Sequence, residues 1–590
     1  MRAIALFGVF ILVKIMILSG HSVPLSVWTP IAYFWQDVMV ALIFAAMDAA
    51  IRRPWLGWTL YTAAVAYAAV NVPVARVLSS PLTWPMMHAA GGALSDSIWH
   101  HVTPANLALM SLVVATAIAL PFMLKRIQFR GGAIGVLVSL LLVLAGPFAT
   151  SRVDTIGLHR NALAAIVASS LPRLSASAAR DHAEEDGAEK DWRASLFDES
   201  SSTGDLAYLR GGASGRNVVL VLLESTGARY LRPYGAGLDP TPNVTALARE
   251  SLVFENAYAV YPESIKTLYS VLCARYPAAD SGAGGFAGSA ESSQISIANG
   301  LKAAGYRTAL FHSGRFMYLG MDDVVGNKGY ELLEDAGAIG GQRESSFGVD
   351  EPSTVRRMLA WIDALPRKDR FFLTYLPIAG HHPYNTPEPG PFPDRDESDR
   401  YLNALHWADA SFGAFLEGLR ARGLSEKTLF IICGDHGEAF GQHEGNFGHS
   451  LFIYDENIRV PYLIAAPGLV REQVRVSRTV SLMDTAPTIL DLIGLPIPTG
   501  YQGRSMLDGG ERMALFFTDY SLRLVGLRDG CWKYIYEIES GRSKIFNLCE
   551  DPEEHHDVAV QYRERVDVYR AHLERWGMAQ TALMTAGRRR

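Results

Sequence analysis

Several patterns that would assign a function at once are absent from this sequence. It contains no P-loop, no dinucleotide-binding fingerprint, no basic patch suited to nucleic acid and no internal repeat. Cysteine is scarce as well, with four in 590 residues, and Cys273 and Cys433 fall in apolar runs typical of core thiols. The function must therefore be inferred from the apolar segments and from local groups of acidic, histidine and hydroxyl side chains.

Apolar residues are abundant for a chain of this length. Hydrophobic residues make up 49% of the sequence and the mean hydropathy is +0.10, which is too apolar for an ordinary soluble protein. The excess lies before residue 150. Five segments there are long enough to span a bilayer, namely 4–19, 30–51, 55–78, 104–124 and 132–150. We therefore expect a transmembrane domain of five helices over residues 1–150.

The short loops between these segments differ in positive charge. The loops at 20–29 and 79–103 contain no Lys or Arg, and Arg76 is the one contrary charge. The remaining positive charges lie at the other ends of the segments: Arg2, Arg52, Arg53, Lys125, Arg126 and Arg130. The positive-inside rule then places the N-terminus in the cytoplasm and everything after residue 150 outside it. A cleaved signal peptide is the competing interpretation of the first segment, but no small-residue cleavage site follows it.

Three charged residues lie inside the predicted spans, where charge is costly: Lys14, Asp37 and Asp48. At about 1.5 Å per residue along a helix, Lys14 and Asp37 reach similar depths. They could form an ion pair, or each could extend separately towards the lipid headgroups.

Residues 151–215 have the composition of a linker. The stretch 154–174 has helical apolar spacing and could lie on the membrane surface, whereas 181–192 and 198–205 are polar and charged. From residue 216 the pattern becomes α/β and continues to about 580, with about 500–580 forming a smaller C-terminal subdomain.

The α/β part contains four apolar, β-branched runs of the kind buried in a parallel sheet, at 217–223, 306–311, 371–376 and 428–433. Helical stretches separate them, which predicts a doubly wound sheet whose site lies beyond the carboxyl ends of the strands. Three chemically distinctive pieces occupy such positions: Glu224, the pair His381 and His382, and the pair Asp435 and His436. Adjacent carboxylate and imidazole groups suit zinc or manganese.

Together these pieces resemble the sulfatase-like branch of the alkaline phosphatase superfamily over about residues 215–560. Landmark segments that carry no catalytic residue occur in the family's order, among them "DPTPNVTALARESLVFENAYA", "YDENIRVPYLIAAPG" and "GCWKYIYEIESGRSKIFNLCEDPEE". Five spans ahead of such a domain further resemble lipoteichoic acid synthases and phosphoethanolamine transferases. The resemblance implies a multi-pass protein of the bacterial inner membrane with its catalytic domain on the periplasmic or extracellular side.

The family's nucleophile position falls on Ser264. Sulfatases of this family carry C-x-P-S-R or its serine equivalent, which directs conversion of the first residue to formylglycine. Here the residues at +2 and +4 are Lys266 and Leu268, so the conversion signal is absent and an unmodified hydroxyl remains. The phosphotransferase branch also uses an unmodified hydroxyl, usually threonine, and Thr267 is the alternative nucleophile. Placed before an apolar helical run, Ser264 would lie at a helix N-terminus, which favours developing negative charge.

The resemblance also implies a ligand set for one divalent metal, zinc in preference to manganese: Glu224, Ser264, Asp435 and His436. His381 and His449 resemble histidines that contact the substrate, and they would bind phosphoryl oxygens or protonate the leaving alkoxide. His443 is a further candidate for the site. His312 and Arg315 could line the pocket or serve a structural role.

Two functions compete. The first is a membrane phosphotransferase that moves a phospho-alcohol group, phosphoethanolamine or phosphoglycerol, from a phospholipid donor to a glycan or lipid acceptor through a covalent Ser264 intermediate. The second is a membrane-anchored hydrolase of phosphate or sulfate esters, and a non-catalytic glycan-binding protein is a weaker third alternative. Cys531 and Cys549 flank an expected hairpin, and an extracytoplasmic location would permit a disulfide between them.

Overall fold

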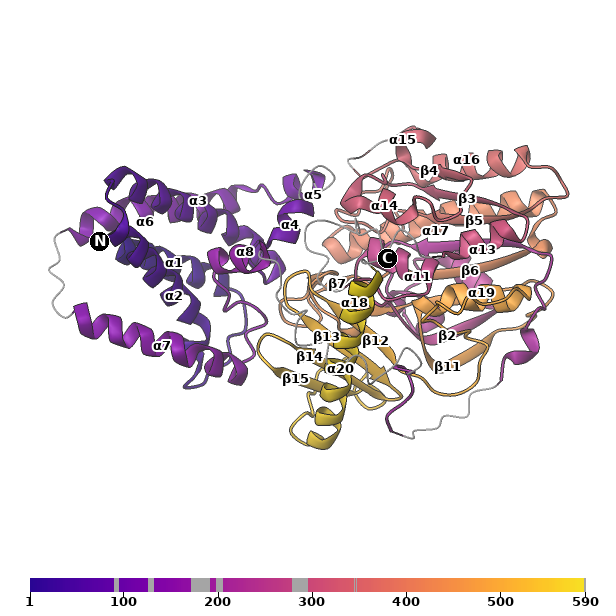
Figure 1. The fold of residues 1–590 in the computed structure, drawn as a ribbon. Helices are drawn as coiled ribbons and strands as arrows, with labels where there is room; N and C mark the ends of the chain where they lie inside the picture. Colours follow the sequence, from indigo (N-terminus) through magenta and orange to yellow (C-terminus); the bar gives the residue numbers. More distant parts are fainter. Residues whose placement is uncertain are drawn as a thin grey trace.

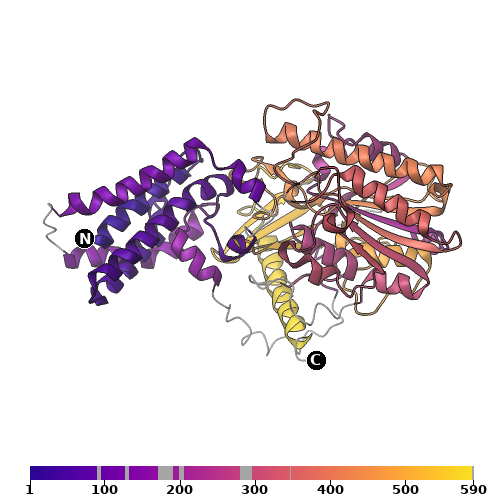
Figure 2. The same ribbon diagram turned by 90° about the horizontal axis from the view of Figure 1, so that it is seen from above.

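The computed structural model of the protein describes residues 1–89, 95–125, 132–170, 191–197, 205–278, 295–343, 345 and 347–587. A helical N-terminal region lies beside an α/β region, and the last helix, α20, runs along the second of these (Figures 1 and 2). Arg126, Arg130 and most of the charged stretches expected in the linker lie outside the described residues.

The N-terminal helical region, residues 1–170, contains the predicted apolar helices. Among the described residues, four helices are long and apolar enough to cross a membrane: α2 (Thr29–Ala50), α3 (Pro54–Leu78), α6 (Pro104–Leu124) and α7 (Gly132–Arg152). The prediction of five spans is therefore approximate. The first segment is helix α1 (Arg2–Leu18), which has 17 residues. Shorter helices follow: α4 (Trp84–Ala89), α5 (Ser95–His100) and α8 (Ala162–Ser170).

Helix α1 packs among the other helices of the helical region. It contacts α2, α3 and α6, and eight of its residues are buried. Its Lys14 pairs with Asp37 of α2 at 3.5 Å. The prediction of an ion pair is therefore confirmed, and the alternative that each side chain extends separately towards the lipid headgroups is wrong. The Lys14 ammonium also donates to the carbonyls of Leu158 and Arg160, and Asp37 accepts a hydrogen bond from Asn161. The segment that follows α7 thus contributes hydrogen bonds to both charged groups.

The α/β region is built on a nine-stranded, mostly parallel sheet, as the sequence predicts. Along the sheet the order is β11 (Val474–Ser481), β2 (Ser251–Tyr258), β10 (Tyr462–Ala465), β6 (Thr428–Gly434), β1 (Asn217–Leu223), β5 (Arg370–Leu376), β3 (Tyr306–His312) and β4 (Leu332–Glu334), with β9 (Arg459–Val460) paired to β2. Strand β10 runs antiparallel to both β2 and β6, so β2 and β6 point the same way.

Helices cover both faces of this sheet, and β1 shows why. Its residues are buried throughout, and alternate side chains enter different cores: Val218, Leu220 and Leu222 one, Val219, Val221 and Leu223 the other. The first core includes side chains of α11 (Ser264–Cys273), α13 (Ile297–Ala303), α14 (Met321–Val325) and α19 (Thr485–Ile493). The second includes side chains of α10 (Pro242–Ala248), α16 (Glu351–Ala364) and α17 (Glu397–Ala421).

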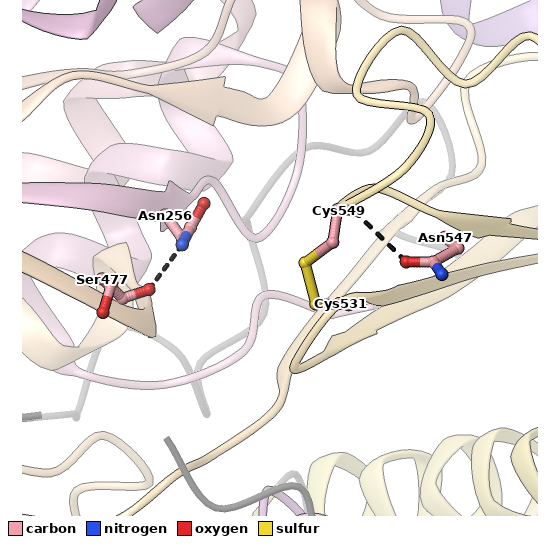
Figure 3. Close-up of a disulfide and its surroundings, with 5 residues drawn as sticks. All are labelled: Asn256, Ser477, Cys531, Asn547 and Cys549. Carbon is pink, nitrogen blue, oxygen red and sulfur yellow. Dashed lines mark hydrogen bonds between the residues drawn. A yellow bond between two sulfur atoms is a disulfide. The ribbon is translucent and has the colours of Figure 1, made fainter. Parts of the chain in front are cut away.

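A second, antiparallel sheet follows in the order β12 (Ala514–Thr518), β13 (Leu524–Asp529), β14 (Trp532–Glu537) and β15 (Arg542–Asn547), and α20 (Arg563–Gly587) packs on it. The predicted hairpin is β14 and β15. Cys531 and Cys549 at its open end form a disulfide with their Cα atoms 5.3 Å apart, as Figure 3 shows. In the same view Asn256 of β2 binds the Ser477 carbonyl of β11 within the large sheet.

The helical region contacts the α/β region through residues at α4 and through the segment between α7 and α8. Met86 of α4 belongs to the same buried cluster as the core of the large sheet. Thr83 donates to the carbonyl of Tyr520 at 3.1 Å, and Arg160 donates to the carbonyl of Ser521 at 2.9 Å. The two regions therefore share a packed and hydrogen-bonded interface.

Candidate active site

The site lies where β1, β5, β6 and β2 end, because these strands point the same way and their carboxyl ends meet at one edge. Glu224 follows β1 directly. The next residue, Ser225, adopts φ 52°, which turns the chain sharply after the strand. Its hydroxyl donates to Glu224 Oε1 at 3.0 Å and its N–H donates to Asp435 Oδ1 at 2.9 Å. Ser225 thereby orients two carboxylates from two different strands.

Asp435 and His436 follow β6 in a tight turn between two glycines. A Cβ on Gly434 would lie 2.2 Å from the Thr226 carbonyl oxygen, and one on Gly437 would lie 2.1 Å from that of Glu456, so neither position admits a side chain. Asp435 Oδ1 accepts hydrogen bonds from the N–H groups of Ser225 and His436. The hydrogen bond of His436 Nδ1 to the Gly437 carbonyl, at 3.0 Å, directs Nε2 towards Ser264.

Ser264 is the first residue of helix α11, which comes after β2. Its hydroxyl donates to Glu224 Oε2 at 3.0 Å and lies 3.2 Å from His436 Nε2. Thr267, the alternative nucleophile, is fully buried and its hydroxyl donates to the Tyr261 carbonyl at 2.8 Å. Of the two hydroxyls, only that of Ser264 faces the carboxylates, with the helix N-terminus behind it.

Four candidate ligand atoms converge here at distances that suit a tetrahedral cation. His436 Nε2 lies 3.7 Å from Glu224 Oε1 and 3.5 Å from Asp435 Oδ2, and the Ser264 contacts are shorter. In a tetrahedral zinc site, metal–ligand bonds near 2.1 Å separate the ligands by about 3.4 Å. Glu224, Asp435 and His436 are 8%, 3% and 0% exposed. The predicted residues thus lie together, and Glu224, Asp435 and His436 form a buried group whose ligand atoms are close enough to hold one metal ion.

The electrostatics of these groups also suit a cation. Burial, and then the charge of Asp435, raise the pKa of Glu224 well above its usual range. Burial lowers the pKa of His436, which keeps that imidazole neutral. The two carboxylates therefore face each other across a neutral histidine, and a divalent cation would relieve their repulsion.

His449 stacks on His436, with ring centroids 4.0 Å apart. Its Nδ1 contacts Glu438 Oε2 at 2.8 Å, and Tyr384 donates to Glu438 Oε1 at 2.7 Å. Burial alone would lower the pKa of His449, but the charge and hydrogen bond of Glu438 raise it to about 9. His449 is thus a positively charged donor, and its 2.8 Å contact is a direct ion pair rather than a metal bridge.

His381 lies in the loop after β5 with its ring centroid 6.4 Å from that of His449. Nδ1 lies 2.8 Å from the His382 carbonyl, to which it donates, so Nε2 carries the lone pair. Burial lowers the pKa of His381 to about 4. The two histidines therefore differ in charge, one neutral and one protonated, which is the condition for separate base and acid roles.

The two other candidate histidines, His443 and His312, make structural contacts. His443 contacts Glu456 Oε1 at 2.6 Å and the Glu554 carbonyl at 3.1 Å, so both ring nitrogens are used. His312 contacts the Leu376 carbonyl at 3.2 Å and stacks on Phe316.

Sequence reasoning missed the groups that position the site residues: Ser225, Tyr384 and Glu438. Glu438 lies two residues after His436 in "GDHGEAFG", and that spacing was a usable signal, since a buried acid beside two histidines needs a partner. Tyr384 gave no such signal, because its contact with Glu438 joins residues 54 positions apart.

The geometry agrees with comparisons to known proteins. Residues 216–495 match the family model described as Sulfatase. This part of the chain is therefore similar to sulfatase-family domains. Residues 443–575 also match the model described as the C-terminal part of N-sulphoglucosamine sulphohydrolase, which covers the second sheet.

Individual relatives come from two groups. "Lipoteichoic acid synthase-like YvgJ" of Bacillus subtilis is 26% identical over 380 residues, covering 60% of this chain and 58% of that protein. Bovine "Arylsulfatase K" is 31% identical over 176 residues, covering 26% of this chain and 32% of that protein. The matches thus span less than two thirds of each relative. The crystal structure of the lipoteichoic acid synthase LtaP from Listeria monocytogenes has the same fold, with a TM-score of 0.50, 17% identity and coverage of 65% of this chain and 96% of that one.

Proposed function

We propose that the protein is a metal-dependent membrane phosphotransferase that moves a phospho-alcohol group, phosphoethanolamine or phosphoglycerol, from a phospholipid to a glycan or lipid of the cell envelope. The observation that carries this proposal is the Ser264 hydroxyl, which donates to Glu224 at the start of helix α11. A sulfatase would need a formylglycine there, and its conversion signal is absent. The likeness to lipoteichoic acid synthases supports the same choice.

The residues divide the reaction into two steps. In the first, Ser264 Oγ bonds to phosphorus and gives up its proton along the hydrogen bond to Glu224, while the bond from phosphorus to the diacylglycerol oxygen breaks. Protonated His449 supplies the proton that this alkoxide needs. In the second, the acceptor hydroxyl gives its proton to the lone pair of His381 and attacks phosphorus. The bond from phosphorus to Ser264 Oγ breaks, and Ser264 takes its proton back from Glu224.

Glu224, Ser264, Asp435 and His436 would hold one divalent metal, with zinc favoured over manganese because carboxylate and imidazole ligands at this spacing suit tetrahedral coordination. When bound, the metal would supply charge to polarise the phosphoryl oxygen and to lower the pKa of the serine hydroxyl.

The N-terminal helical region supports the proposed donor and cellular location. The four apolar helices found among the described residues exceed what anchoring needs, since one would suffice. The loop segments that lack Lys and Arg contact the α/β region, for example His21 with Glu444 at 2.8 Å. This supports the orientation that the positive-inside rule predicts, with the catalytic domain on the outer face of the inner membrane.

A hydrolase of sulfate or phosphate esters is the second candidate. The match of residues 443–575 to a sulphohydrolase C-terminal segment favours it, as do the arylsulfatase relatives. In that case water would replace the acceptor alcohol in the second step.

Mass spectrometry of the purified full-length protein, incubated with phosphatidylethanolamine or phosphatidylglycerol, tests the proposal. We expect a phospho-alcohol adduct on Ser264 and release of diacylglycerol, with both lost in Ser264→Ala. Ser270→Ala in the same helix is the matched control, because its hydroxyl donates to the Lys266 carbonyl away from the site. Release of sulfate from a soluble ester, with no adduct from either lipid, would favour the hydrolase.

A further inference from the structure

A second group of metal-ligating side chains lies between the two regions of the protein. His100 ends helix α5 of the N-terminal helical region, which Figure 1 shows against the α/β region. His382 lies in the loop after β5, and Glu397 begins helix α17. Candidate ligand atoms of these three residues lie within 4.8 Å of one another.

Their spacing is that of the buried group in the active site. His100 Nε2 lies 3.5 Å from Glu397 Oε1, and His382 Nε2 lies 3.8 Å from the same oxygen. The corresponding separations around His436 Nε2 are 3.5 and 3.7 Å. Both pairs of distances are close to the edge of about 3.4 Å expected between ligands of tetrahedral zinc. Both imidazoles lie within ion-pair range of the Glu397 carboxylate, so the three side chains already converge on one point.

Neighbouring groups hold the rings in place without occupying the centre. The ring of His101 stacks on His382 with an interplanar angle of 5° and centroids 5.6 Å apart. The His100 ring meets His382 edge-on at 5.3 Å. The Arg400 guanidinium is 4.0 Å from Glu397 Oε1, which is beyond hydrogen-bond range, and it also pairs with Asp394. One carboxylate oxygen thus faces two imidazole nitrogens that come from different regions.

We propose that His100, His382 and Glu397 bind a second divalent cation of the zinc class, with water completing the coordination. Two imidazoles and one carboxylate are a common donor set for zinc with an open position. The side chains are 41%, 20% and 39% exposed, so the cation can enter and leave from solvent.

The cation would join helix α5 to the loop that carries His381. Because His382 directly follows His381, a ligand bond to His382 would hold the substrate-contacting loop against the N-terminal helical region. Its role is therefore to fix the position of the helical region at the mouth of the site, rather than to take part in phosphoryl transfer.

Zinc stoichiometry of the full-length protein in detergent tests this proposal. The protein is stripped with a chelator and dialysed against buffered Zn²⁺, and bound zinc is measured by elemental analysis. We expect wild type to bind two equivalents of zinc. Asp435→Ala should bind one equivalent, which belongs to the new site. Both His100→Ala and Glu397→Gln should lose the second equivalent and keep the first. His101→Phe is the matched control, because it keeps a flat ring against His382 but has no ligand nitrogen, and it should bind as wild type does.

Thermal melting of each variant without added metal checks that it is folded, and the exposure of His100 makes its replacement mild. Co²⁺ provides an independent probe, since its visible spectrum reports nitrogen and oxygen ligation. A wild-type protein that binds a single equivalent, or a second equivalent that survives both His100→Ala and Glu397→Gln, would overturn the proposal. Loss of the second equivalent in His101→Phe would also contradict the ligand set.

Discussion

The two histidine–carboxylate groups have similar spacing but opposite environments. Around the active-site group the side chains are at most 8% exposed and all belong to the α/β region. In the interface group they are 20–41% exposed, and one of them comes from the N-terminal helical region. Burial decides how costly an uncompensated charge is, so the first group depends on a cation far more than the second.

The difference in burial determines the role that each group can have. Buried ligands are oriented by further hydrogen bonds, as Ser225 orients Glu224 and Asp435, and this rigidity suits chemistry. Exposed ligands at an interface are held mainly by ring contacts, so their strength depends on how closely the two regions approach. The predictions below test this contrast, beginning with the largest effect.

Asp435→Ala should abolish turnover. The change removes one carboxylate from the buried group and leaves the N–H groups of Ser225 and His436 without their acceptor. We expect a loss of at least about a thousandfold in activity on a soluble phosphodiester, as is usual when electrostatic stabilisation of the reacting group is removed. Elemental analysis should show that the first metal is lost as well.

Glu397→Gln is the control for this experiment, because it removes a carboxylate charge from the exposed group instead of the buried one. It should keep the first metal and near-normal activity on the soluble diester. An Asp435→Ala protein with full zinc occupancy at the first site would show that the buried ligands are assigned wrongly.

Glu438→Gln should have an intermediate effect. It removes the charge opposite His449 but keeps the size of the side chain and the acceptor for Tyr384. Residues that orient a functional group through a hydrogen bond typically contribute about 10- to 100-fold, and we expect a fall of that size in kcat with bound metal unchanged. Steady-state kinetics alongside metal analysis would check this. A rise in KM with an unchanged kcat would indicate that His449 does not act in the chemical step.

Much of the fold could be predicted because its signals are local. The four apolar runs predict β1, β3, β5 and β6, and each lies in the large sheet. Strands β2, β10 and β11 were not predicted. Strand β2 is half polar in its second part, and β10 has only four residues, so neither has a strong pattern. Their pairing depends on contacts between distant segments.

The candidate site divides in the same way. Glu224, Asp435 and His436 are visible in the sequence because each directly follows a strong strand. Ser264 required the family resemblance, since β2, the strand before it, has no clear pattern. His100 could not be found at all, because its partners are almost three hundred residues away and only the packing of α5 on the α/β region brings them together.

Asp154→Asn should have the smallest effect. It measures how much a partly exposed ion pair between the two regions contributes to stability. Asp154 follows α7, and its Oδ2 contacts Lys544 at 2.7 Å and Arg542 at 2.9 Å in the second sheet. Since the carboxylate is 32% exposed, solvent screens the pair, and we expect a loss of roughly 0.5–1 kcal/mol in stability at pH 7. Differential scanning calorimetry of wild type and variant would measure it as a small fall in Tm.

The pH dependence of that fall identifies its cause. Burial alone would raise the pKa of Asp154, but the charges of Lys544 and Arg542 outweigh it and lower the pKa. A lowered carboxyl pKa stabilises the folded state above the unfolded pKa of about 3.9 and loses that contribution as pH falls towards the folded value. The difference in Tm should therefore be constant between about pH 6 and 8 and shrink below about pH 4. If it stays the same in acid, packing rather than charge holds this part of the interface, and the contrast between buried and exposed groups would not extend to ion pairs.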